Sequence, residues 1–230
     1  MRKIILLFFF IPVLLRSQPK VTEGKLFYDI TYQNLTAEMK EHEHQLPHDA
    51  TFYFKNEKCR LEMGAGPFGK NVTITDKTKK ETIILLNIYG KKFAMRKSDS
   101  EMVEVINSLK TDTARIDIKI ELVNDTKKIA GYICHKAFII KTKNGISNKS
   151  ECWFTRDLPP YTTEGDEAFK MIDGFLMQYS TFEANINRTL TVKMVMPLPI
   201  EDRYFEIPPG YQIVTETELV NVLNVMQQGR

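Results

Sequence analysis

The chain has 230 residues, 32 of them basic and 29 acidic, and a formal net charge of +3. Arg2, Lys3 and Arg16 lie in the N-terminal leader described next, and removing them leaves 29 basic against 29 acidic side chains. This balance argues against a basic surface for nucleic acid or anionic membranes. At 43% hydrophobic residues the chain is rich enough to bury a core, and its length suits one large β domain.

The N-terminus has the pattern of a secretory signal peptide. Met-Arg-Lys is followed by an apolar run over residues 4–15 and then by Arg16-Ser17-Gln18. A positive start, a short apolar run and a small residue at the cut define such a leader, whereas about 20 apolar residues are needed to span a bilayer. We therefore expect a signal peptide at residues 1–17, a single β-rich domain at residues 18–230, and export to the periplasm or outer envelope with no integral membrane segment after cleavage. An uncleaved membrane anchor is the alternative.

The first half of the domain reads as consecutive short strands. Asn56-Glu57 separates two of them as a hairpin turn. Alternating or β-branched segments predict strands at residues 24–32, 50–55, 58–63, 72–76, 82–89 and 92–96. Ser98 with Glu101 then forms a capping box that predicts an amphipathic helix to about residue 109.

Residues 115–122 alternate most regularly. Ile116, Ile118, Ile120 and Leu122 point to one side, and charged residues point to the other. This pattern predicts a strand with one buried and one solvated face.

Residues 127–158 organise the fold. Two runs rich in aromatic and β-branched residues flank the turn signal Asn144-Gly145, which predicts a β-hairpin. We place the turn centre near Ser147. Leu158-Pro-Pro160 ends the second arm, because proline cannot donate to a strand ladder.

The remaining segments supply further strands and two helices. Residues 166–173 read as a short helix closed by Gly174, residues 175–184 and 190–196 as long strands, and residues 204–207 and 211–214 as extended pieces around Pro208-Pro-Gly210. Thr215 with Glu218 is a second capping box, which predicts a helix to Gly229. The fold class is therefore α+β, with a strongly curved antiparallel sheet (a half-barrel) and two or three short helices across its concave face.

Three segments resemble a known group of families. These are Ile129-Ala-Gly-Tyr-Ile-Cys-His-Lys-Ala137, Cys152-Trp-Phe-Thr-Arg-Asp-Leu158 and Ile172-Asp-Gly-Phe-Leu-Met-Gln-Tyr179. They are similar to exported Bacteroidota envelope families of unknown function, GLPGLI-like and related domains. The resemblance implies a lipoprotein-carrier (LolA-like) fold. It also implies weakly that the protein carries an apolar ligand.

The cysteines leave two alternatives open. Cys134 and Cys152 lie on opposite arms of the hairpin, and an exported chain meets an oxidising compartment. They either form a disulfide or remain two buried free thiols, with Cys59 unpaired in both cases.

A curved sheet with a helical cover can hold an apolar ligand, and flexible methionines suit variable acyl chains. Val192, Met194 and Met196 are expected to share one strand face. The candidate ligand-binding residues are Met63, Phe93, Met95, Trp153, Met177, Val192, Met194 and Met196. The alternative is that these residues form an ordinary filled core.

The sequence contains no catalytic motif that we can identify: neither a Gly-x-Ser-x-Gly elbow, nor His-Glu-x-x-His, nor Cys-x-x-Cys. His42, His44 and His48 are weak metal candidates, because their spacing matches no standard zinc motif. We therefore expect no catalytic residues, no metal, no cofactor and no nucleic acid.

The leading hypothesis is an exported non-enzymatic envelope protein that binds or carries a lipid or other apolar ligand. The alternative is a structural or assembly module with a filled core, which acts through an envelope protein partner at a sheet edge.

Overall fold

The computed structural model describes residues 21–64, 69–88, 90–101, 116–161, 167–183 and 186–228. The expected signal peptide at residues 1–17 lies outside the described residues, and so does the expected helix beyond Glu101. No helix of the described residues is long and apolar enough to cross a membrane.

The described strands form a single twelve-stranded sheet in the order β12-β6-β5-β4-β3-β2-β1-β11-β10-β9-β8-β7. All neighbours are antiparallel except β12 and β6. The strands are β1 (Glu23–Gln33), β2 (Asp49–Lys55), β3 (Lys58–Gly64), β4 (Lys70–Asp76), β5 (Glu81–Ile88), β6 (Lys91–Ser98), β7 (Asp117–Ile129), β8 (Tyr132–Lys143), β9 (Ile146–Thr155), β10 (Phe175–Glu183), β11 (Ile186–Met196) and β12 (Gln212–Ile213).

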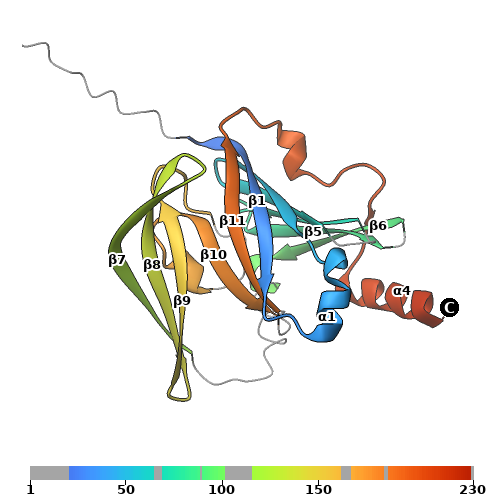
Figure 1. Cartoon of the computed structure of the whole chain (residues 1–230). Coiled ribbons are helices and arrows are strands. Elements are labelled where there is room, and N and C mark those ends of the chain that lie inside the picture. The colour runs from blue at the N-terminus through green and yellow to red at the C-terminus, as the bar shows by residue number, and fades with distance from the viewer. Residues whose placement is uncertain are drawn as a thin grey trace, which may run out of the picture.

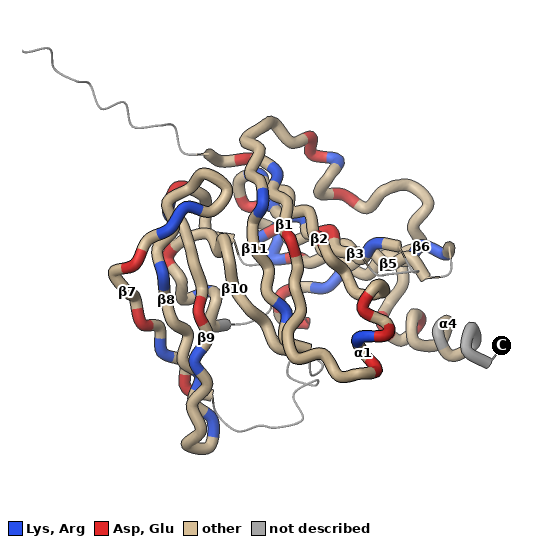
Figure 2. The backbone as a smooth tube through the Cα atoms, in the orientation of Figure 1, with Lys and Arg blue, Asp and Glu red and all other residues tan. Residues whose placement is uncertain are grey.

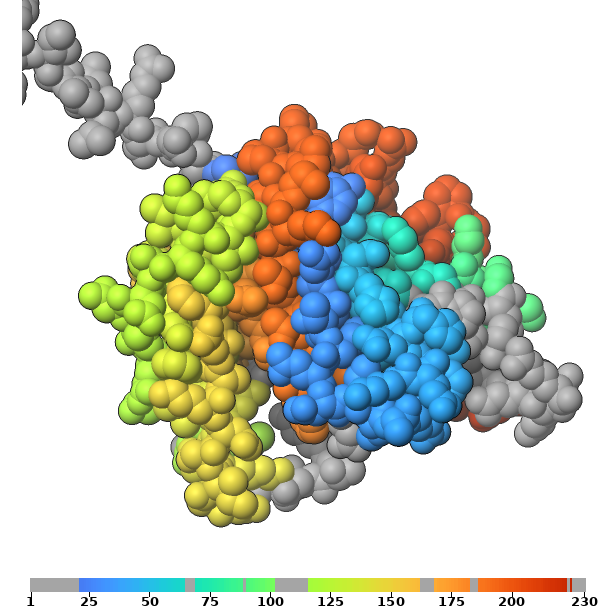
Figure 3. Space-filling model, in the orientation of Figure 1, coloured from blue at the N-terminus to red at the C-terminus, as the bar shows by residue number. Residues whose placement is uncertain are grey.

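The first strand joins two meanders into one sheet. β1 pairs with β2, which begins the meander β2 to β6, and also with β11, which ends the meander β7 to β11. Figure 1 shows the sheet bending around this centre, and Figure 3 shows β1 (blue) beside the orange chain of β11 on the surface. The expected α+β class with an open, curved antiparallel sheet and few helices is confirmed.

Two-residue turns define the central hairpins. Asn144 and Gly145 both have positive φ, at 50° and 77°, which matches the right-handed twist of the flanking strands. The turn centre is therefore at these two residues, and its prediction near Ser147 was wrong. Ala130 and Gly131, with φ of 48° and 88°, form a second such turn. Residues 127–129 consequently belong to β7 and not to the first arm of the predicted hairpin.

The two faces of the sheet carry different clusters. We call the face that carries Leu26, Phe52 and Phe154 the inner face, and the opposite face, which carries Tyr53, the outer face. The inner face holds most of a large buried cluster over β1 to β3 and β8 to β11, which also includes Cys134 and Trp153 of the outer face, and a smaller cluster over β5 and β6. The outer face of β2 to β6 is covered by residues 198–211, through Ile200 and Phe205.

The helices are short and cover parts of the sheet. They are α1 (Ala37–Glu41), α3 (Glu167–Lys170) and α4 (Glu216–Gln228), with 3-10 turns η1 (Glu43–Gln45) and η3 (Asp202–Phe205). α3 packs into the large inner cluster, and α4 packs into the smaller inner cluster through Leu219. Residues 204–207, predicted as extended, instead begin within η3.

Both capping boxes form as predicted. The Ser98 hydroxyl accepts from the Glu101 backbone N–H at 3.3 Å, and the Glu101 carboxylate accepts from the Ser98 N–H at 2.7 Å. Thr215 and Glu218 make the same reciprocal pair at 3.2 and 2.7 Å. Each pair satisfies two donors that the first helical turn leaves without intrahelical partners.

The strand that alternates most regularly in the sequence lies at a sheet edge. β7 pairs with β8, and the described residues place no strand on its other side. Its inner side is therefore only partly covered. Ile118 and Ile120 are half-buried, whereas Ile116 is 45% and Leu122 65% exposed. The expectation that Ile116, Ile118, Ile120 and Leu122 form a buried face was therefore wrong, because an edge strand has a neighbouring strand on one side only and that neighbour covers only part of its side chains.

Candidate functional site

Two rows of side chains cross the inner face from β2 to β6 and connect its two buried clusters. The first row is Phe52, Leu61, Thr73, Ile84, Met95, and strand register places each member directly opposite the next. The second row is Ala50, Met63, Asn71, Leu86, Phe93, in which Met63 lies opposite both Ala50 and Asn71, and Leu86 lies opposite Phe93. The end residues are buried, whereas the apolar residues between them, Leu61, Met63, Ile84 and Leu86, are half-buried. We call these four residues and the nearby half-buried Ile88 the inner strip.

The inner strip contains or adjoins three of the predicted ligand-binding residues. Met63 is a member, and Phe93 and Met95 end the two rows beside α4. These residues come from two strands, β3 and β6, but lie on one face, because the antiparallel register keeps opposed residues on the same side. The arrangement is an apolar surface with two uncharged polar side chains, Thr73 and Asn71, within it, and the guanidinium of Arg188 borders it, 3.7 Å from the Met63 Sδ.

Two further predicted residues belong to the filled part of the inner face. Met177 is fully buried and Val192 is 2% exposed, both in the large cluster. Phe169 of α3 packs with its ring centroid 5.0 Å from that of Tyr179, and Phe52 lies 5.7 Å from Phe175. This half of the face is an ordinary core, which was the alternative left open by the sequence.

A β-bulge moves Met194 and Met196 to the outer face. Tyr28 lies opposite Val192, but Phe27 lies opposite Met194, so Lys193 is an additional residue on β11. One extra residue reverses the side to which the following side chains point. Met194 and Met196 are 46% and 40% exposed, and the prediction that they share a face with Val192 was wrong.

Trp153 also lies on the outer face, where it is 7% exposed. The Lys127 Nζ lies 4.2 Å from the centroid of its ring and the Lys136 Nζ 5.4 Å from it. Its indole N–H donates to Glu151, and Lys127 donates to Gln178 of β10. Trp153 is thus the centre of a cross-strand polar network and not part of the inner strip.

The charges of this network stabilise one another. Lys136 pairs with Glu151 at 2.8 Å. The hydrogen bond from Lys136, with that from Trp153, holds the pKa of Glu151 below its ordinary value despite partial desolvation. Desolvation lowers the pKa of Lys127, and the Glu151 charge opposes that shift. In the sequence, these residues appear only as the polar positions of alternating strands. Which of them lie opposite Trp153 can be known only from the register of β8 and β9.

The three cysteines are free and buried. Cys152 lies opposite Ala137, and Cys134 lies three residues further along β8, which places it about 10 Å along the strand and on the other face. A disulfide needs Cα atoms about 4.4–6.8 Å apart, so of the two alternatives left open by the sequence the structure has the buried free thiols and not the bridge. Burial raises the pKa of the Cys59 and Cys134 thiols to about 11 and that of Cys152 to about 12.

The histidines of the weak metal prediction make local contacts. His48 Nε2 lies 3.1 Å from the Glu43 carbonyl oxygen, and His42 Nδ1 lies 3.4 Å from Gln45 Nε2. The ring of His48 meets that of Tyr32 edge-on. Among the described residues, no group of three or more His, Cys, Asp or Glu side chains has metal-binding geometry.

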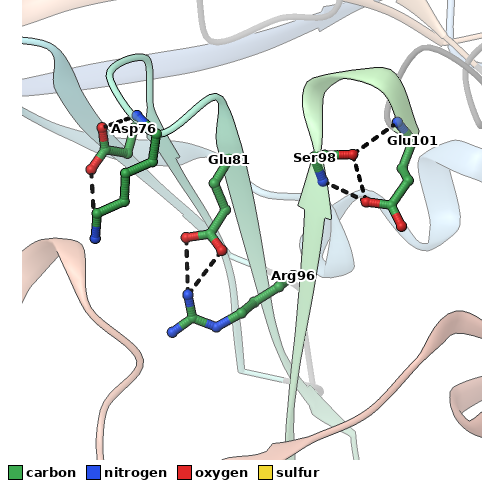
Figure 4. Close-up of polar contacts among 6 residues, drawn as sticks. Asp76, Glu81, Arg96, Ser98 and Glu101 are labelled. Atoms are coloured by element: carbon green, nitrogen blue, oxygen red, sulfur yellow. Dashed lines mark hydrogen bonds and ion pairs between the residues drawn. The ribbon is translucent and has the colours of Figure 1, made fainter.

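A small polar recess lies on the outer face, lined by Asp76, Glu81 and Arg96, whose polar contacts Figure 4 shows. Arg96 donates to both carboxylate oxygens of Glu81 at 2.9 Å, and the Lys79 backbone N–H donates to Asp76 at 3.0 Å. The recess has a volume of about 60 Å³, with Phe205 at its wall. Ligand pockets are typically about 300–1,000 Å³, so we interpret it as a paired-charge patch.

Fold and site together define an α+β protein with an open, curved antiparallel sheet and an apolar strip on its inner face. The chain belongs to the family described as domain of unknown function (DUF4412), whose model matches residues 36–166, more than half of the chain. No curated protein matches it. Among solved structures it is similar to the one described as "Structure of PNGF-II in C2 space group", with a TM-score of 0.49 and 13% identity. That match covers 87% of this chain and 32% of the other, so this chain spans about a third of the length of that protein.

Proposed function

We propose that this protein is an exported, non-enzymatic protein of the cell envelope that binds a lipid or other apolar ligand against the inner strip. The observation that supports this proposal is the half-burial of Leu61, Met63, Ile84 and Leu86 between two buried clusters on one face. Apolar side chains that a fold leaves partly in water gain free energy when an apolar ligand covers them, at about 25 cal/mol per Å². A LolA-like fold and a GLPGLI-like relationship belong to the same proposal.

The absence of an enzymatic role is also proposed. All three thiols are buried and have pKa values of about 11 to 12, so they are protonated at neutral pH. A protonated thiol is a poor nucleophile. This favours a binding role over thiol-based catalysis.

The test is native mass spectrometry of the mature protein purified from its own cell envelope, followed by solvent extraction. We expect a reproducible excess mass that releases a lipid or another apolar compound. A clean mass of the unliganded chain after gentle purification would overturn the proposal.

Two variants locate the proposed binding surface. Leu61→Asp places a charge in the inner strip, and we expect it to abolish the excess mass, because the carboxylate would lose water beneath an apolar ligand. Met194→Asp is the matched control, since Met194 is 46% exposed on the outer face. Circular dichroism verifies that both variants fold, and equal loading of both would contradict the inner strip as the site.

A second candidate function is an assembly module that acts through a protein partner. The exposed apolar side of β7 at the sheet edge favours it, with Leu122 65% exposed. Cross-linking in the envelope would identify such a partner and separates this candidate from ligand carriage.

A further inference from the structure

β7 presents a long edge at the margin of the molecule. It spans Asp117–Ile129 and pairs with β8 on one side. In Figures 1 and 3 it forms the left flank, in green and lime. An edge strand exposes backbone N–H and C=O groups that can pair with another chain.

The straight part of this edge is symmetric about one residue. The register of β7 against β8 is regular from Asp117 to Val123 and then shifts before Thr126. A bulge of this kind twists the strand and ends regular pairing. The regular segment is therefore centred on Ile120, with three residues on either side.

The side chains around Ile120 are self-complementary. Within one chain the Lys119 Nζ lies 2.9 Å from a carboxylate oxygen of Glu121. If two copies pair antiparallel about a two-fold axis at Ile120, Lys119 of one copy also lies opposite Glu121 of the second, so the two intrachain pairs join into one alternating set of charges. Ile118 then lies opposite Leu122 on the inner side, which covers an apolar side chain that is 65% exposed in the single chain. Opposite charges and apolar pairs across strands stabilise a sheet.

Neighbouring registers are worse. Opposed residues of paired strands must lie on the same face of the sheet. The two-fold axis can therefore pass through a residue but not between two residues, and the nearest alternative axes lie at Lys119 and Glu121. An axis at Lys119 places Lys119 opposite itself, and an axis at Glu121 places Glu121 opposite itself. Like charges directly opposite are destabilising. Figure 2 shows acidic and basic residues along β7.

We propose that β7 pairs with β7 of a second copy of this chain, antiparallel and centred on Ile120, so that the two sheets join into one. A two-fold interface of this kind uses the same surface on both copies. The inference rests on the second candidate function, for which it names the partner. It is independent of ligand binding to the inner strip, which is more than five strands away in the sheet order.

Charge exchange tests the register. We expect sedimentation velocity to show a dimer of the mature wild-type chain at roughly 100 µM. Lys119→Glu and Glu121→Lys each place like charges opposite one another, so we expect either variant to dimerise at least tenfold more weakly. Mixing the two variants should restore the dimer, because every opposed pair in the mixed species is then of opposite sign. Lys193→Glu, on the exposed outer face of β11, is the control and should dimerise as the wild type does.

Cysteine cross-linking provides a second readout that does not depend on charge. Ile120→Cys lies opposite itself across the axis and should form an intermolecular disulfide under mild oxidation. Leu122→Cys is the control, since its two copies would lie about 13 Å apart along the strands. The native cysteines are buried and contribute little background.

Three results would overturn the proposal. They are a wild-type monomer at roughly 100 µM, a dimer that both charge variants leave unchanged, and cross-linking of Leu122→Cys but not of Ile120→Cys. Cross-linking of Ile120→Cys to a different protein in the envelope would also overturn the second copy as partner, while supporting the assembly function itself. Excess mass in the ligand experiment would be unaffected by any of these results.

Discussion

The ammonium group of Lys127 lies 4.2 Å from the ring centroid of Trp153, although the two residues belong to β7 and β9 with β8 between them. The indole is 7% exposed. A cation held over a shielded indole contributes about 0.5–2 kcal/mol. The pair therefore connects the edge strand to the interior of its meander.

Replacing Lys127 with methionine keeps the aliphatic stem and removes the charge. We expect a loss of about 1 kcal/mol in the free energy of unfolding, because the variant loses both the cation over the indole and the hydrogen bond to Gln178. Urea denaturation followed by fluorescence measures it directly, because Trp153 is the only tryptophan. Lys128→Met is the control, since Lys128 is exposed on the adjacent position; an equal loss in both variants would contradict a specific Lys127–Trp153 contribution.

The ion pair of Glu151 predicts a pH dependence. Its pKa is lower in the folded chain than the ordinary value near 4.5. The unfolded chain therefore takes up the proton first as pH falls, and the stabilisation by Glu151 is complete above about pH 5 and lost as pH drops through the folded pKa.

Glu151→Gln removes this titration. We expect the stability of the wild type to fall more steeply than that of the variant between about pH 5 and pH 3, measured by urea unfolding at each pH. Parallel pH profiles for the two proteins would show that the Lys136–Glu151 pair does not bias folding.

The cysteine geometry predicts three free thiols. In denaturant without reductant, alkylation followed by intact-mass analysis should add three groups, one for each cysteine. In the folded protein near pH 8 the reaction should be slow, because the thiols are buried and their pKa values are about 11 to 12. A single adduct in denaturant would indicate a Cys134–Cys152 bridge and a different register of β8 on β9.

Gly174 permits a close backbone contact before β10. A Cβ at this position would lie 2.6 Å from the Thr155 carbonyl oxygen and 2.6 Å from the Phe154 ring. Gly174→Ala should therefore destabilise the protein by roughly 1–3 kcal/mol, because the backbone of β9 must shift.

Gly64→Ala is the matched control, since the nearest atom to its added Cβ is 3.8 Å away in Pro47. Thermal unfolding of both variants measures the difference. A midpoint for Gly174→Ala equal to that of Gly64→Ala would show that the approach of Gly174 to Thr155 is not required.

The strands and their turns were largely predictable because their signals are local. Asn144-Gly145 predicted a hairpin and adopts the positive φ angles that such a turn requires. Thr215 and Glu218 predicted a helix start and form the reciprocal hydrogen bonds. The inner strip was predicted only in part: Met63, Phe93 and Met95 share the inner face as strand alternation suggests, whereas Trp153 does not.

The sequence by itself determined which segments form most of the strands and where the two capped helices begin, because periodicity and capping act over two to four residues. Only the tertiary structure decided which side each apolar residue faces and whether it is covered. Lys193 turns Met194 outward by a bulge, and Leu122 is exposed because its strand is at the sheet edge. Both facts depend on pairing between segments far apart in the chain, and that pairing energy has no signature within either segment alone.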